Sequence, residues 1–245
     1  MAYSDVILAE ASLVAYWRLG TGSTDVDDAS GNGHGFTKTG TPAEVAGLLP
    51  AESDTARDLP GSVSHYYEAA DHADFDFLVN APYSIEAWVN FHTIDTLFRR
   101  IIQHHNGTNG WGLLIHGPGG PNLYVSRQAG GVETISNFTT PSVGVTYHVV
   151  GTYDGTNQLL YINGSLVDTD ASAGSIGAVA TGVRTGFGGG GDYVDGVLDE
   201  IAVYSAALTH DEVVEHYAAG TNVGFRFSNS QFPKAMLRPA TPVRY

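Results

Sequence analysis

Hydrophobic and polar residues alternate along most of the chain between residues 13 and 204, and Gly, Asn, Asp and Pro interrupt the alternation at short intervals. A period of two is typical of strands with one buried face, and the interrupting residues are typical of turns. Because this many strands need two packed sheets, the predicted fold class is an all-β, two-sheet antiparallel sandwich. The predicted strands are residues 15–19, 83–91, 99–105, 112–116, 122–126, 132–136, 146–153, 158–162, 165–170 and 194–204.

The clearest local pattern lies between residues 147 and 168. Two alternating segments flank the turn sequence Asp154-Gly-Thr-Asn157, and the pair Asn163-Gly164 precedes a third segment. An Asn-Gly pair between such segments favours a type I′ hairpin turn, because both central residues must accept a positive φ. The stretch is therefore predicted to be a β-meander.

Two short helices are predicted outside this alternating region. Thr209 is expected to cap a late helix, and Glu212, three residues later, completes a capping box. The apolar residues that follow lie on one helical face, and Gly220 ends the helix. A shorter helical turn is expected to begin at Ser4.

Composition divides the chain into an N-terminal segment (1–12), the sandwich domain (13–220) and a C-terminal arm (221–245). The arm has no acidic residue, and its three prolines exclude regular structure. Its aromatic residues argue against a solvated spacer, because disordered segments are poor in them. The arm residues expected to dock on a partner are Phe225, Arg226, Phe227, Phe232, Lys234, Arg238 and Arg244.

Charge and composition exclude several classes of function. Eleven basic and 26 acidic residues give a net charge of −15, and such a surface repels phosphate backbones, so no nucleic-acid partner is expected. No apolar stretch approaches the ~18 residues that span a bilayer, and no export signal is recognised, so no membrane insertion is expected. The absence of cysteine excludes disulfides, thiolate zinc sites and cysteine nucleophiles.

Five blocks of sequence follow one another in an order that is more specific than any single block. They are Leu13-Val-Ala-Tyr-Trp-Arg-Leu19 with Asp28-Ala-Ser-Gly-Asn-Gly-His34, Tyr83-Ser-Ile-Glu-Ala-Trp-Val89, Trp111-Gly-Leu-Leu-Ile115, Tyr147-His-Val-Val-Gly-Thr-Tyr-Asp-Gly155 with Leu160-Tyr-Ile-Asn-Gly164, and Gly196-Val-Leu-Asp-Glu-Ile-Ala-Val-Tyr204 with Ala207-Leu-Thr-His-Asp-Glu212. Spanning about residues 13–219, they resemble the laminin-G-like jelly-roll family of the concanavalin A-like lectin/glucanase superfamily. The resemblance implies a concanavalin A-like jelly roll, a fold that is typically extracellular.

The resemblance also implies a structural Ca²⁺ between the Gly-rich loop 28–34 and the late Asp-Glu strand that contains Asp199. Glycines let backbone carbonyls turn toward a cation, and Ca²⁺ takes oxygen ligands. Glu200 is expected to point to the opposite face of the strand. The alternative is an Asx-turn, with Asp199 hydrogen-bonded to backbone amides. The candidate ligands are Asp28, Asn32, Gly33 and Asp199.

Aromatic residues are the candidates for sugar stacking. Trp17, Trp88 and Trp111 lie inside strand patterns and are expected to fill the sandwich core. Tyrosines beside loops are better placed to stack on a glycan, provided that they are exposed. The glycan-binding candidates are Tyr66, Tyr67, Tyr124 and Tyr193.

No enzymatic activity is expected. A glucanase of this superfamily carries a run such as Glu-x-Asp-x-x-Glu on one strand, and the sequence has none. It also has no Gly-x-Ser-x-Gly motif, phosphate-binding loop or dinucleotide-binding motif. Zinc is not expected either, because His104 and His105 would face opposite sides of a strand and the pair His104 and His116 has no evident third partner.

The leading functional hypothesis is a non-enzymatic structural or decoration protein on the virion surface of a tailed bacteriophage, in capsid or tail. Residues 2–9 and 14–19 resemble laminin-G-like phage structural proteins, which reach the outside by lysis. The arm would dock on other virion proteins or on copies of the same chain. Outward loops would bind host surface glycans, with weak affinities amplified by many copies. The alternatives are a secreted, extracellular carbohydrate-binding module and, less favoured, a divergent glycosidase.

Overall fold

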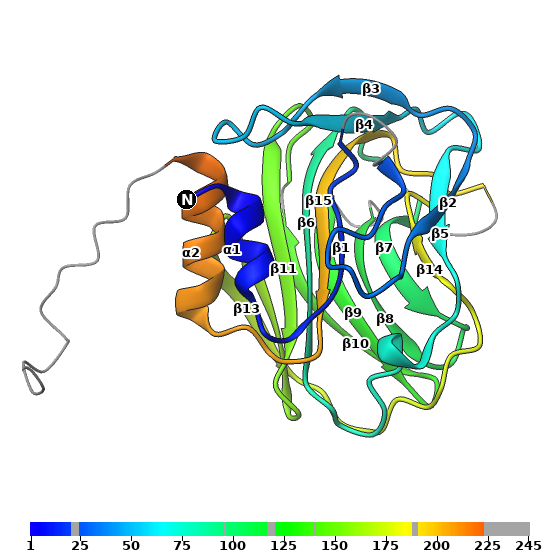
Figure 1. The fold of residues 1–245 in the computed structure, drawn as a ribbon. Helices are drawn as coiled ribbons and strands as arrows, with labels where there is room; N and C mark the ends of the chain where they lie inside the picture. The colour runs from blue at the N-terminus through cyan, green and yellow to red at the C-terminus, as the bar shows by residue number, and fades with distance from the viewer. Residues whose placement is uncertain (21–24, 96, 117–120, 140, 188–190, 223–245) are drawn as a thin grey trace, which may run out of the picture.

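The computed structural model describes residues 1–20, 25–95, 97–116, 121–139, 141–187 and 191–222 (Figure 1). The described strands form two antiparallel sheets packed face to face, which confirms the predicted sandwich. The helix-covered sheet contains, in spatial order, β13 (Ser165–Ala171), β12 (Asn157–Ile162), β11 (Thr146–Tyr153), β6 (Tyr83–Phe91), β15 (Gly196–Tyr204), β4 (Thr55–Leu59) and β3 (Ala43–Ala46), with β1 (Leu13–Trp17) also paired to β15. The uncovered sheet contains β10 (Val132–Thr139), β9 (Asn122–Ala129), β8 (Gly110–His116), β7 (Arg99–His105), β14 (Val183–Thr185), β5 (Tyr66–Ala69) and β2 (Phe36–Thr39).

Strand β6 lies in the middle of the helix-covered sheet and is buried on both faces. Ile85 and Val89 point into the core between the sheets, whereas Glu86 and Trp88 point to the opposite face. Successive strand residues alternate between faces, so a strand with both faces covered contains few exposed positions.

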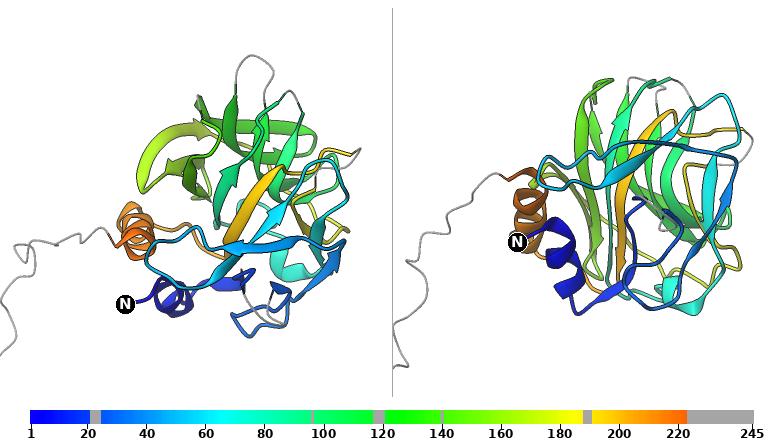
Figure 2. Two further views of the ribbon diagram at one scale, coloured as in Figure 1. Left: turned by 90° about the horizontal axis from the view of Figure 1, so that it is seen from above. Right: turned by 45° about the horizontal axis from the view of Figure 1, so that its top comes forward.

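Helices α1 (Tyr3–Ala9) and α2 (His210–Thr221) lie side by side on the outer face of the helix-covered sheet (Figure 2). Tyr3, Ile7 and Val213 from the helices pack with residues of the sheet in a second apolar cluster. Both predicted helices are therefore confirmed, but α2 does not end at Gly220: it continues to Thr221, and its C-cap is Asn222. None of the helices in the described residues is long and apolar enough to cross a membrane.

The capping box of α2 forms as predicted. The backbone N–H of Glu212 donates to the Thr209 side chain at 3.3 Å, and Glu212 accepts from the backbone N–H of Thr209 at 2.6 Å. The predicted meander is also present as β11, β12 and β13. Between β12 and β13, Asn163 and Gly164 have φ values of 52° and 76°, as the type I′ turn requires.

The C-terminal arm lies outside the described residues from residue 223 onward. The seven residues predicted to dock on a partner all belong to that segment, so their docking stays a prediction: Phe225, Arg226, Phe227, Phe232, Lys234, Arg238 and Arg244.

Candidate functional site

The outer face of the uncovered sheet carries a groove over β7, β8, β9 and β10. On β8 and β9, alternate residues such as Leu113 and Val125 fill the core, so their neighbours point outward and line the groove. The groove consists of two hollows of about 310 and 240 Å³ that share Phe98, Tyr124 and Glu133. The remaining lining residues are Arg100, His105, Gly107, Leu114, His116, Asn122, Gln128, Ile135 and Asn137.

Apolar side chains form part of the groove surface. Phe98 is 44% exposed and stacks on His116, with ring centroids 3.5 Å apart. Ile135, on β10, is also exposed in the same hollow. Tyr124 lies deeper, with only 4% of its surface exposed. Because exposed apolar surface is costly to leave in water, a groove of this composition is suited to a ligand with apolar patches.

Polar groups surround these apolar surfaces. Ser126 donates a hydrogen bond to Glu133, and the His105 ring pairs with the Gln128 side chain. Nε2 of His116 is buried and has no hydrogen-bond partner among the described residues. Burial lowers the pKa of His116, so its ring is neutral at pH 7.

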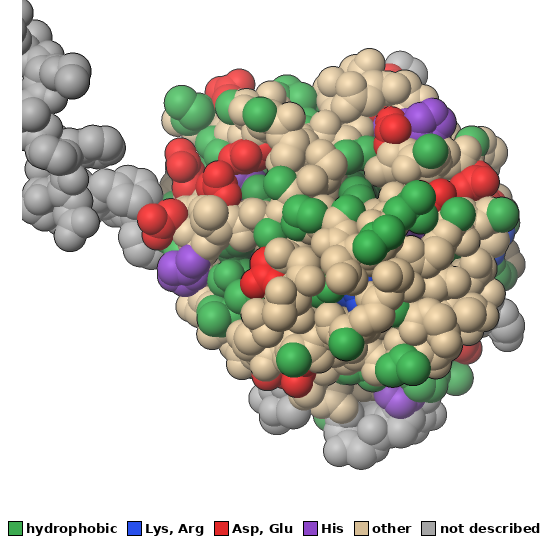
Figure 3. All heavy atoms as spheres, turned by 90° about the horizontal axis from the view of Figure 1, so that it is seen from below, with side chains coloured by type: hydrophobic (Ala, Val, Ile, Leu, Met, Phe, Trp, Pro, Cys, Tyr) green, Lys and Arg blue, Asp and Glu red, His purple; other side chains and the backbone are tan. Residues whose placement is uncertain are grey.

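Burial raises the pKa of Tyr124, and the nearby Glu133 carboxylate raises it further against the opposing effect of Arg100. The phenol is therefore neutral at physiological pH and retains its O–H as a donor. Arg100 and Glu133 carry opposite charges, so the groove has no large net charge. The face of the molecule in Figure 3 shows several Asp and Glu side chains and very few Lys or Arg, in keeping with the net charge of −15.

Two of the four predicted glycan-binding tyrosines are not exposed. Tyr67 is fully buried and donates a hydrogen bond to Asp25 at 3.2 Å, and Tyr124 is almost fully buried. Neither residue is therefore the exposed stacking platform that was predicted. Tyr67 faces the core between the sheets, whereas Tyr124 faces the groove but is almost completely covered.

The other two tyrosines, Tyr66 and Tyr193, are partly exposed and meet around Phe187. Phe187 stacks on Tyr66 and Tyr193 at centroid distances of 4.9 and 5.1 Å, and the two tyrosine rings are 6.5 Å apart. Ser64 donates a hydrogen bond to the Tyr193 hydroxyl at 2.8 Å. This cluster at β5 and β14 is a second candidate stacking surface.

The carboxylate of Asp28 is occupied by hydrogen bonds within its own loop and β1. One oxygen accepts from the Tyr16 and Ser30 backbone N–H groups at 3.0 Å each and from the Ser30 hydroxyl at 2.6 Å, and the other accepts from the His34 N–H at 2.9 Å. Burial raises the pKa of Asp28, but these hydrogen bonds outweigh it and hold the pKa below its ordinary value. The contacts match the Asx-turn alternative.

The other predicted calcium ligands have different partners. The Asn32 side-chain amide donates to the Val14 carbonyl at 2.9 Å, and Gly33 has a φ of 91° in the exposed part of the loop. Asp199 is 1% exposed and accepts from the Leu48 N–H at 2.8 Å, while its second oxygen has no partner among the described residues. Asp28 and Asp199 share no hydrogen-bond partner, so the hydrogen bonds described above do not bring the four candidate ligands together. Calcium binding stays a prediction.

Glu200 does not point away from Asp199 as the sequence suggested. Its φ is 47°, and the pairing of β15 with β6 is irregular between Asp199 and Ala202. This irregularity breaks the alternation of faces. Arg18 donates to Glu200 at 3.0 and 3.1 Å. Burial, and then the Glu200 charge beside it, raises the pKa of Asp199.

Sequence reasoning missed most of the groove. Phe98 and Ile135 did not stand out because a single large apolar residue on the surface is ordinary, and His116 was considered only as a zinc ligand. The sequence did contain one indication of the groove: Leu114 and Tyr124 are large hydrophobic residues at strand positions where an outward-facing residue is usually polar. It becomes informative only once β8 and β9 are known to be neighbours.

Comparison with known families gives one match. The family Laminin_G_3, described as the concanavalin A-like lectin/glucanases superfamily, matches residues 61–214, which is more than half of the chain. A comparison with curated proteins finds no match.

Solved structures share the fold at low sequence identity. Domain 4 of AbnA, a GH43 extracellular arabinanase from Geobacillus stearothermophilus, in complex with arabinotriose, has a TM-score of 0.67 and 20% identity over 85% of this chain and 99% of that chain. The binding domain of Paraclostridial mosquitocidal protein 1 has a TM-score of 0.68 and 17% identity over 85% of this chain and 52% of that chain.

Botulinum neurotoxin type C, which depends on interaction with two ganglioside molecules to enter cells, has a TM-score of 0.67 and 15% identity over 88% of this chain and 52% of that chain. The chain thus spans about half the length of the toxin structures that it matches. At these identities the likeness concerns the fold.

Proposed function

Because the chain belongs to the Laminin_G_3 family of the concanavalin A-like lectin/glucanases superfamily, we propose that it is a non-enzymatic carbohydrate-binding protein. The binding site is the groove on the uncovered sheet. The observation that supports this most directly is the combination of exposed Phe98 and Ile135 with polar side chains in one hollow.

The groove chemistry suits a sugar ring. One face of a pyranose or furanose presents C–H groups that pack on apolar surface, and its rim presents hydroxyl groups. Phe98 and Ile135 supply the apolar surface, and Asn137 and Glu133 supply hydrogen-bonding partners. Such sites combine apolar area with a few placed polar groups.

The charge of the site favours a neutral oligosaccharide. Arg100 and Glu133 oppose each other in the groove, and the chain as a whole carries −15. A strongly anionic glycan would be repelled by this field. Arabinotriose, the ligand of the arabinanase domain with this fold, is a neutral probe of suitable size.

The test is titration calorimetry with arabinotriose, after a screen of neutral oligosaccharides for tighter ligands. Phe98→Ala and Ile135→Ala are expected to weaken binding at least about tenfold, equivalent to about 1.4 kcal/mol. Val132→Ala is the control, because Val132 is 69% exposed on the same strand as Ile135 but does not line the hollows. Equal loss in the groove variants and the control, or no binding by the wild type to any oligosaccharide of the screen, would contradict the proposal.

We also propose that the protein acts on a virion surface, to which its C-terminal arm attaches it. The support for this proposal is the resemblance of residues 2–9 and 14–19 to phage structural proteins, together with the basic and aromatic arm. The test compares the full chain with a chain that ends at Asn222, the C-cap of α2, by light scattering. We expect only the full chain to associate. Monomers in both cases would instead favour a secreted carbohydrate-binding module.

A further inference from the structure

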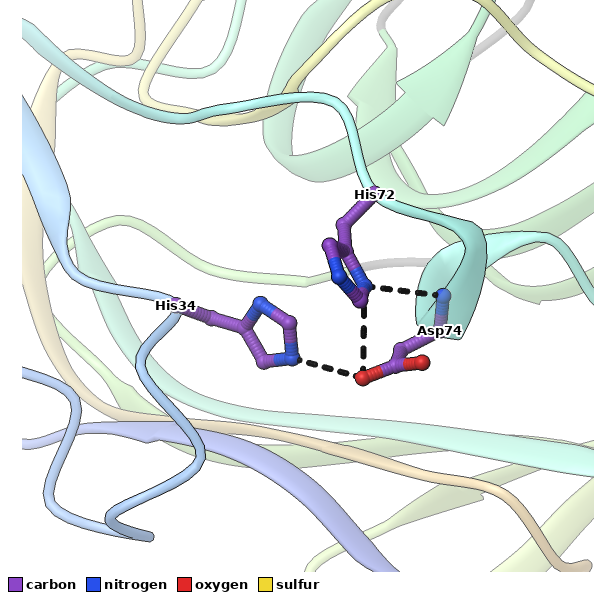
Figure 4. Close-up of side chains that lie close together, drawn as sticks. All are labelled: His34, His72 and Asp74. Atoms are coloured by element: carbon purple, nitrogen blue, oxygen red, sulfur yellow. Dashed lines mark hydrogen bonds and ion pairs between the residues drawn. The ribbon is translucent and has the colours of Figure 1, made fainter.

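Three potential metal ligands meet where the loop before β2 approaches the 3₁₀ helix η2 (Ala73–Phe75) and its N-cap residue, His72 (Figure 4). His34 Nε2 lies 3.0 Å from Asp74 Oδ2, and His72 Nδ1 lies 3.3 Å from the same oxygen. One candidate ligand atom from each residue can be chosen so that all three lie within 4.8 Å of one another. Among the described residues, no other group of three His, Asp or Glu side chains meets this condition.

His34 is held in place before any ion binds. Its backbone N–H donates to Asp28 at 2.9 Å, and its carbonyl accepts from the Trp17 indole at 2.7 Å. Its ring packs against Phe75 at a centroid distance of 4.7 Å and is 8% exposed as a residue. A ligand fixed by its surroundings loses little conformational entropy when it binds a metal.

The other two ligands are accessible. The side chains of His72 and Asp74 are 53% and 51% exposed, so an ion can reach them from solvent. Nδ1 of His72 currently accepts the Asp74 backbone N–H at 3.2 Å. An ion at that nitrogen replaces this hydrogen bond, a small loss for an exposed group.

The donor atoms select the class of ion. Two imidazole nitrogens and one carboxylate oxygen suit Zn²⁺ and similar transition metals, whereas Ca²⁺ prefers oxygen ligands. Tetrahedral Zn²⁺ with bonds of about 2.0–2.1 Å separates its ligand atoms by about 3.3 Å. The two spacings of 3.0 and 3.3 Å to the Asp74 oxygen are close to that value.

We propose that His34, His72 and Asp74 bind a divalent transition metal ion of the Zn²⁺ class, with the fourth position open to solvent. The ion joins the segment between β1 and β2 to the segment between β5 and β6. In this arrangement Asp28 positions the ligand His34 through its backbone. The histidine site also revises the expectation that no histidine of this chain serves as a zinc ligand. It is independent of the carbohydrate groove.

The experiment is calorimetric titration of the full-length, chelator-treated protein with ZnCl₂, with a thermal melt at each metal concentration. The wild type is expected to bind one Zn²⁺ in its tightest phase and to melt at a higher temperature when loaded, because the ion binds the folded state. His72→Ala and Asp74→Asn are expected to weaken that phase at least about tenfold. Both side chains are half exposed, so both variants should fold.

His210→Ala is the matched control, because it removes an exposed histidine at the start of α2 and leaves the three ligands intact. It should bind Zn²⁺ like the wild type, and excess Ca²⁺ should not displace the ion. The proposal is overturned if His72→Ala and Asp74→Asn bind as the wild type does, if all variants show only weak multiple binding, or if Ca²⁺ displaces Zn²⁺.

Discussion

Glu86 is a buried carboxylate whose acceptor positions are filled from four directions. One oxygen accepts from the Tyr3 hydroxyl and from His148, both at 2.6 Å. The other accepts from the Tyr204 hydroxyl at 2.8 Å and from His216 at 2.9 Å. Burial would raise the pKa of Glu86, but His216 and His148 outweigh it and hold the pKa well below its ordinary value. The charge is therefore retained inside the protein because its partners replace its hydration.

Individual residues were predictable from the sequence where a side chain's size and strand position decide its environment. Trp17 and Trp111 are 0% and 2% exposed in the core between the sheets, as predicted. Trp88 is also buried, but it belongs to the cluster under the helices, so its predicted place in the sandwich core is wrong. Tyr67 was not predictable in this way, because closeness to a loop does not determine which face of the strand a residue occupies. Its neighbour Tyr66 stands on the opposite, partly exposed face.

Contacts between distant residues could not be derived from spacing. His34 meets Asp74 across 40 positions of sequence, and this contact depends on β2 pairing with β5. The same limit applies to Asp28. The family resemblance implied a cation site at this residue, whereas the backbone N–H groups that surround its carboxylate are visible only in the folded loop.

At the scale of elements, all ten predicted strands are present, although some ends shift by a few residues. Their strong alternation reflects sheets with defined faces. The strands that were missed are short or irregular, because three to five residues provide too little periodicity to detect. They are β2, β3, β4, β5 and β14.

The cap of α2 gives a prediction at this scale. Thr209→Ala removes the side chain that accepts from the Glu212 N–H, and the cost is expected to be about 1 kcal/mol of unfolding free energy. Urea denaturation monitored by circular dichroism measures it. Thr108→Ala, at an exposed loop position, should change stability by less than about 0.5 kcal/mol. Equal stability of wild type and Thr209→Ala would show that the cap contributes nothing.

At the scale of the whole molecule, the two sheets have different roles. The helices α1 and α2 cover one sheet, and the Glu86 cluster connects both helices to it through Tyr3 and His216. The outer face of the other sheet carries the groove. A rigid, fully packed layer behind the groove strands keeps their outward side chains in fixed register, which is what a preorganised binding surface requires.

The buried pair of His216 and Glu86, which connects α2 to the sheet, predicts how the unfolding free energy depends on pH. Burial alone would lower the pKa of His216, but Glu86 and Glu10 outweigh it and raise the pKa to about 10. A histidine in the unfolded chain has a pKa of about 6.5. The folded protein therefore holds this proton more tightly, and its stabilising contribution is complete below about pH 6.5 and is lost as the pH rises to about 10.

The measurement is the unfolding free energy in urea between about pH 7.5 and pH 10, with an expected slope of up to about −1.4 kcal/mol per pH unit. Glu200, whose pKa burial raises to about 7, changes charge mainly below this interval. His216→Gln should flatten the slope whatever its effect on absolute stability, because it removes the group that binds the proton. His210→Gln, which changes an exposed histidine on the same helix, should keep the wild-type slope. If the unfolding free energies of wild type and His216→Gln fall equally steeply with pH, loss of the His216 proton is not the cause of the pH dependence.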